Sequence, residues 1–85
     1  MTSAFLAAFD ALPSGTFKAT FEDRAYVVTR SALSKGKAQK LVAEELGGTD
    51  YISMNLYRLA SGPLLKPCEM PAQKVVAFVL GVTPN

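Results

Sequence analysis

The sequence predicts one α+β domain: an antiparallel sheet of four or five strands with an N-terminal and a C-terminal helix packed on one face. Alternation of apolar and polar residues over 16–22 and 51–57 has the period of half-buried strands. Apolar residues near both chain ends recur at helical spacing. A chain of 85 residues supports only one hydrophobic core, so we treat residues 1–85 as a single domain.

The first element expected is a helix over residues 3–12, in which apolar side chains recur three or four positions apart. Thr2 or Ser3 can cap its N-terminus, and the Pro-Ser-Gly of residues 13–15 ends it. Such a short amphipathic helix needs a sheet to cover.

A hairpin is expected next, with one strand over residues 16–22 and a second over residues 25–30. A tight turn at residues 23–24 would place Phe21 opposite Tyr26 and give the hairpin one apolar face.

Residues 35–46 fit two interpretations. The run KAQKLVAEEL consists of strong helix formers and ends at two glycines, a good helix C-cap, so local propensity favours a helix. Leu41 and Ala43 also alternate with their neighbours, however, and the following Gly-Gly-Thr-Asp suits a loop into another strand. The sequence leaves both structures open.

Residues 50–59 have the clearest strand pattern, in which three apolar side chains alternate with the polar and aromatic face of Tyr51, Ser53, Asn55 and Tyr57. Residues 64–68 can run back antiparallel as an edge strand, because Pro67 cannot donate to a further strand.

The last element expected is a helix with Pro71 at its first position and Gly81 at its end. It is apolar on most sides, which predicts burial against the sheet. The expected core is Phe5, Phe9, Phe17, Phe21, Val28, Ile52, Met54, Leu56, Val76 and Val79.

The composition argues against an enzyme. Histidine is absent, and Cys68 is the only cysteine, so neither a zinc site nor a histidine-activated nucleophile can be assembled. The paired carboxylates at 22–23 and 44–45 are chain neighbours that point in different directions. We expect no catalytic residues, no metal and no cofactor.

A cytoplasmic location is expected, because a single cysteine allows no internal disulfide. The N-terminal residues lack the basic start of a signal peptide, and no apolar run is long enough to span a bilayer.

Basic residues gather in the middle of the chain, where Arg24, Arg30, Lys35, Lys37 and Lys40 occur without an acid between them. Such a block suits either a solvated surface or the steering of a charged partner. The tyrosine face of residues 51–57 is likewise either the wet side of a sheet or a contact surface. The candidate partner-binding residues are Arg24, Arg30, Lys35, Lys37, Lys40, Tyr51, Asn55, Tyr57 and Arg58.

The stretch from Lys40 to Tyr57, followed by Lys66 to Pro71, resembles small uncharacterised proteins of bacterial genomes and mobile elements. In size and in its lack of catalytic residues the chain also resembles phage-borne inhibitors such as anti-CRISPR proteins. These resemblances imply no particular activity and carry no site residues.

The function expected is therefore that of a small, non-enzymatic regulator or inhibitor that binds another protein. The alternative is a basic nucleic-acid-binding module that uses the Arg24 to Lys40 block and the tyrosine face. The chain is expected to act as a monomer, or as a homodimer paired through the edge strand near residues 64–68.

Overall fold

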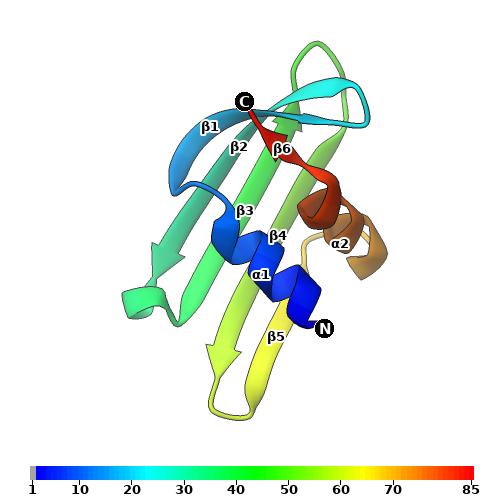
Figure 1. The fold of residues 1–85 in the computed structure, drawn as a ribbon. Coiled ribbons are helices and arrows are strands. Elements are labelled where there is room, and N and C mark those ends of the chain that lie inside the picture. Colours follow the sequence, from blue (N-terminus) through cyan, green and yellow to red (C-terminus); the bar gives the residue numbers. More distant parts are fainter. Residues whose placement is uncertain (1) are drawn as a thin grey trace.

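A six-stranded antiparallel sheet carries two helices on one of its faces (Figure 1). The computed structural model describes residues 2–85, and every count of elements or contacts refers to these residues. The elements in chain order are α1 (Ser3–Ala11), β1 (Gly15–Phe21), β2 (Arg24–Leu33), a 3-10 turn (Ser34–Gly36), β3 (Ala38–Glu45), β4 (Tyr51–Leu59), β5 (Gly62–Pro67), α2 (Ala72–Gly81) and β6 (Thr83–Pro84).

The strands form a meander, in which each of the first five pairs with its neighbour in the chain. Strand β6 returns to the far side of β1, where Pro84 lies opposite Ala19, so the order across the sheet is β5-β4-β3-β2-β1-β6. The predicted α+β class and the two helices on one face are confirmed. The expected strand count is too low, since a two-residue strand leaves no alternation in the sequence.

The helix that local propensity favours for residues 35–46 is wrong, and the alternative strand is correct. Leu41 and Ala43 of β3 are fully buried beneath the helices, and β3 lies between β2 and β4 with Leu41 opposite Met54. A strand in this place completes the sheet and buries both apolar side chains on one face. That packing outweighs helix propensities that differ by only about 0.7 kcal/mol per residue.

The β1–β2 hairpin turns one residue earlier than predicted. Glu22 and Asp23 occupy the turn with φ of 50° and 63°, as a two-residue hairpin of the type I′ kind requires. Phe21 consequently lies opposite Arg24, not Tyr26. Moving the turn by one residue shifts the pairing register between β1 and β2 by two residues, so each side chain stays on the predicted face of the sheet.

The helix boundaries agree closely with the sequence prediction. Thr2 is the N-cap of α1, and its hydroxyl accepts a hydrogen bond from the Phe5 amide at 3.2 Å. Pro71 lies at the N-cap of α2, one residue before the position expected for it. Neither of the helices within residues 2–85 is long and apolar enough to cross a membrane.

The hydrophobic core fills the space between the helices and the sheet. Phe17, Phe21 and Val76, expected in the core, are only half-buried against it. The buried apolar side chains are Phe5, Phe9, Leu12, Ala19, Tyr26, Val28, Leu41, Ala43, Ile52, Met54, Leu56, Val75, Phe78 and Val79. All strand members of this set point toward α1 and α2, which leaves the opposite face of the sheet uncovered.

Candidate binding face

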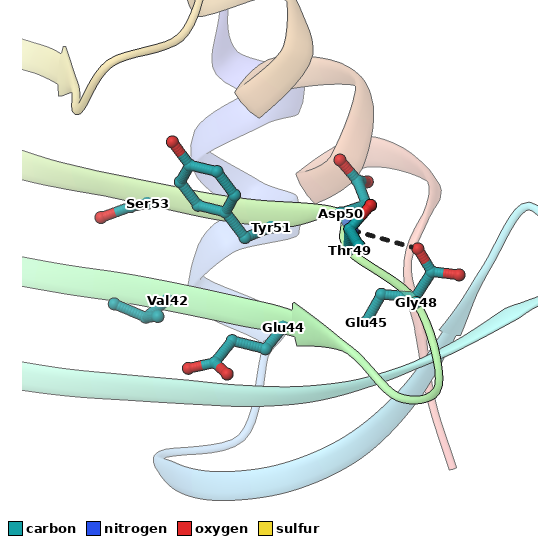
Figure 2. A pocket seen from close by; sticks show the side chains of 8 residues that line it. All are labelled: Val42, Glu44, Glu45, Gly48, Thr49, Asp50, Tyr51 and Ser53. Atoms are coloured by element: carbon teal, nitrogen blue, oxygen red, sulfur yellow. Dashed lines mark hydrogen bonds between the residues drawn. The ribbon is translucent and has the colours of Figure 1, made fainter.

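The face of the sheet that points away from α1 and α2, termed the open face, carries no covering element among residues 2–85. In β4 the side chains of Ile52, Met54 and Leu56 are buried under the helices, while the residues between them point the other way. Figure 2 looks onto the open face, with both helices behind the strands and with Val42 and Ser53 in front. The predicted polar and aromatic face of β4 therefore belongs to an uncovered surface.

The strand register orders the open face into rows of side chains that run across the strands. One row, termed the apolar row, consists of Leu33, Ala38, Tyr57 and Leu64 on β2, β3, β4 and β5. Leu33 is 59 % exposed and Leu64 is 40 % exposed, and Tyr57 lies between them. Single exposed leucines are ordinary, but leucines that share a row with a tyrosine form a continuous apolar surface.

The next row, termed the lysine row, consists of Ser31, Lys40, Asn55 and Lys66. Lys40 and Lys66 flank Asn55 from the two neighbouring strands, and both lysines are exposed. Lys35 and Lys37 lie in the connection between β2 and β3, at the same end of the sheet. These four lysines make no ion pair with any described residue.

Acidic residues occupy the opposite end of the sheet. Glu22 and Asp23 form the β1–β2 turn, and Glu44, Glu45 and Asp50 surround the β3–β4 connection. In a meander these two connections lie at the end away from the β2–β3 connection. The sheet is therefore polarised along its strands, basic at one end and acidic at the other.

The sequence block from Arg24 to Lys40 is divided by the fold. Arg24 lies at the acidic end, where its guanidinium is 3.9 Å from the Glu45 carboxylate. Arg30 points to the helix-covered face, and only Lys35, Lys37 and Lys40 meet at the basic end.

Arg30 and Arg58 bind α1 to the sheet. Arg30 donates hydrogen bonds to the Leu12 carbonyl at 2.5 Å and to Gln39 Oε1 at 3.0 Å, and its guanidinium lies 4.8 Å from the centre of the Phe9 ring. Arg58 pairs with Asp10 of α1. Both arginines, selected from the sequence as partner-binding residues, therefore lie behind the open face.

The other β4 candidates lie on the open face but not together. Tyr51 is 41 % exposed at the start of β4, and Lys74 of α2 lies 5.6 Å from the centre of its ring. Asn55 is half-buried beside the Cys68 sulfur. Tyr51 and Tyr57 are six residues apart, roughly 20 Å along an extended strand, so they do not form one stacking platform.

A shallow hollow of about 430 Å³ lies at the acidic end, between the β3–β4 connection and the start of β4 (Figure 2). Two of its three carboxylates, those of Asp50 and Glu45, are already engaged. Asp50 accepts hydrogen bonds from the Tyr26 hydroxyl and from Lys74, both at 2.7 Å, and Glu45 accepts one from the Asp50 amide at 3.2 Å. No metal-binding group of three acidic, cysteine or histidine side chains occurs in the described part of the chain.

Hydrogen bonds and burial shift two pKa values at this end. The pKa of Asp50 lies below 3.8, because Lys74 and then Tyr26 donate hydrogen bonds to its carboxylate. Burial, reinforced by the bond to Asp50, raises the pKa of Tyr26 to about 12.

These shifts predict that the free energy of unfolding falls at both extremes of pH. The contribution of Asp50 is present above about pH 4 and is lost as the pH falls through its lowered folded-state pKa. Between about pH 10 and pH 12 the unfolded tyrosine ionises while folded Tyr26 keeps its proton, which costs roughly 1.4 kcal/mol per pH unit. Urea unfolding measured at a series of pH values gives the free energy of unfolding as a function of pH. The alkaline decrease should disappear in Tyr26→Phe, and the acidic decrease should disappear in Asp50→Asn. Unchanged slopes in these variants would contradict the assignment.

The β5 edge of the sheet is poorly suited to further strand pairing. The Cys68 amide donates inward to the Ser53 carbonyl at 2.9 Å, so alternation along β5 points the backbone nitrogens of residues 63, 65 and 67 outward. Pro63 and Pro67 have no N–H, which leaves Leu65 as the only outward donor within β5. At the other edge β6 pairs with β1. We therefore do not propose a homodimer paired through β5.

Sequence reasoning missed Leu33, Leu64 and Lys66. Leu64 and Lys66 alternate with Leu65 and Pro67, and this alternation is the signal that places them on one face of a strand. Comparison of the chain with protein-family models, with curated proteins and with solved structures found no match. The open face is therefore the main basis for inferring its function.

Proposed function

We propose that this protein is a small, non-enzymatic regulator or inhibitor that binds another protein through its open face. The observation that carries the proposal is the apolar row, whose leucines are 59 % and 40 % exposed on a sheet face that no described element covers. Covering such a row removes apolar area from water, which is the dominant favourable term in protein association. Tyr57 within the row is a residue type enriched at interface centres.

The same face is less suited to nucleic acid. Sheets that bind single strands place aromatic rings where successive bases can stack. Here Tyr51 and Tyr57 are six residues apart, and the neighbours of Tyr57 across the strands are Ala38 and Leu64. Arg30 and Arg58 point to the helix-covered face and Arg24 lies at the acidic end, so no arginine lies beside the lysines on the open face to bind a phosphate bidentately. The second candidate function, nucleic-acid binding, is supported by the four unpaired lysines at the basic end.

A non-enzymatic role is supported by the residues available for chemistry. The sequence contains no histidine, and the carboxylates Glu45 and Asp50 of the hollow already accept hydrogen bonds from neighbouring groups. An acid or base in catalysis needs a proton site open to substrate.

Site-specific photo-crosslinking in a lysate of the source cells tests the proposal. A crosslinking amino acid at position 64 on the open face should capture one protein, and the adduct should survive nuclease and high salt. The matched control carries the crosslinker at Gln73, an exposed position of α2 on the other side of the molecule. Equal labelling from both positions would contradict binding by the open face, and recovery of salt-labile, nuclease-sensitive nucleic acid without a protein adduct would favour the second candidate.

A further inference from the structure

We infer that the segment of the partner that contacts the open face is an acidic amphipathic helix, seated on the apolar row with its acidic flank on the lysine row. This inference rests on the proposed function and names the chemistry of its partner. The two rows together are called the basic half of the open face.

Charge complementarity is the first argument. Lys40 and Lys66 lie within the basic half, and Lys35 and Lys37 border it at the β2–β3 connection. Neither row contains an acidic residue, and the four lysines make no ion pair with any residue of the described chain. Apolar side chains bordered by unpaired cations fit a ligand whose apolar side chains are bordered by carboxylates.

The spacing of the rows is the second argument. Lys40 and Lys66 lie on strands two places apart, which separates their backbones by roughly 10 Å, and the apolar row lies two residues further along, at roughly 7 Å. An α-helix with its side chains is about 10 Å wide. One helix can therefore place an apolar stripe on Leu33, Tyr57 and Leu64 while carboxylates beside that stripe reach the lysines.

The scarcity of outward donors at the β5 edge is the third argument, and it favours a helix over an extended segment. A strand that added to β5 would find only the Leu65 amide as a donor, because Pro63 and Pro67 interrupt the outward N–H groups. A helix satisfies its own backbone hydrogen bonds and needs only side-chain contacts from the sheet face. The opposite face of this sheet is already covered by helices in this way (Figure 1).

The test uses two synthetic helical peptides of about 18 residues, long enough to form several helical turns. Both carry leucines at helical spacing on one face; the first has glutamates beside the leucines, and the second has lysines in the same places. Each peptide is titrated into the ¹⁵N-labelled full chain and followed by NMR. The acidic peptide should shift the amides of residues 31–33, 38–40, 55–57 and 64–66 and bind at least tenfold more tightly than the basic peptide.

Charge-reversal variants separate this contact from general electrostatics. Lys40→Glu with Lys66→Glu changes two exposed side chains and should weaken binding of the acidic peptide by tenfold or more. The matched variant Lys18→Glu changes a lysine in the other half of the open face, beside Val27, and should change the affinity less than threefold. Equal losses in both variants would overturn the inference.

Other occupants give different results. Tighter binding of a single-stranded oligonucleotide or of phosphatidylglycerol vesicles than of the acidic peptide, at the same amides, would overturn the inference in favour of a phosphate ligand. A dimer in sedimentation with these amides in its interface would overturn it by making a second copy the occupant. If the crosslinked adduct at position 64 persists in the charge-reversed double variant, the inference of an acidic helix is overturned while protein binding by the open face stands. The absence of any protein adduct would contradict the proposed function itself.

Discussion

Replacing Phe78 by alanine should lower the free energy of unfolding by about 4 kcal/mol, within the range measured for buried phenylalanines. Phe78 of α2 is fully buried, and its ring centre lies 5.0 Å from that of Phe21 and 5.2 Å from that of Tyr26. Truncation removes the ring that joins the helix to β1 and β2 and leaves a cavity. Stabilities of roughly 5–15 kcal/mol are typical of whole domains, so a loss of this size removes much of the total.

Urea denaturation followed by circular dichroism would measure this loss. Because Phe78→Ala can unfold the protein altogether, Phe78→Leu serves as the milder variant, with an expected loss of about 1.5 kcal/mol. Leu80→Ala, on the same helix at a side chain that is 51 % exposed, is the matched control and should change the free energy by no more than about 0.5 kcal/mol. A Leu80 effect equal to that of Phe78→Leu would contradict the packing described.

Replacing Arg30 by alanine should lower the free energy of unfolding by about 3 kcal/mol. From the sequence alone, an arginine in a basic block would be expected on the surface, where its replacement has little effect. Its side chain is only 14 % exposed, and it satisfies the Leu12 carbonyl at the end of α1 together with the Gln39 side chain. Its charge also complements the carboxyl end of the helix dipole and lies over the Phe9 ring. Alanine would leave the buried acceptors without donors, which is costlier than the loss of the bonds themselves.

Arg58→Ala is the matched control for Arg30→Ala. Arg58 pairs with Asp10, whose carboxylate also lies 3.8 Å from the Arg30 guanidinium. The Arg58 side chain is 34 % exposed, so the expected loss is below about 1 kcal/mol. Thermal or urea unfolding of both variants at equal ionic strength would compare them. Equal losses would mean that general charge effects, not the hydrogen bonds of Arg30, stabilise α1.

The alternation of side chains was enough to predict the fold class, both helices and four of the strands. It failed where local and tertiary preferences conflict: residues 38–45 have helix-forming side chains, but two flanking strands need a partner between them. The position of the β1–β2 turn was predicted one residue too late, because neither Glu22 nor Asp23 is the glycine that usually marks a type I′ turn in a sequence. Strand β6 depends on a contact with β1, distant in the chain.

The candidate site was predicted only in part, because the sequence does not assign a charged residue to a face until the register is known. Arg24, Lys37 and Lys40 belong to one stretch of the sequence without acidic residues. Strand β2 nevertheless places Arg24 at one end of the sheet and the two lysines near the other. Lys66 joins Lys40 from a distant part of the chain through Asn55. The resemblance to mobile-element proteins and the inhibitor role stay predictions, and the crosslinking experiment tests the protein binding on which the inhibitor role depends.

The meander also determines how the chain should fold in time. From β1 to β5 each strand pairs with the next strand in the chain, so the sheet can form hairpin by hairpin with short loop closures at every step. The contacts that span most of the chain are those of α1 with α2 and of β1 with β6. Refolding should therefore form the five-stranded meander first and order the two terminal segments around it last. Substitutions in α2 should mainly accelerate unfolding, whereas substitutions in the central hairpins should slow folding.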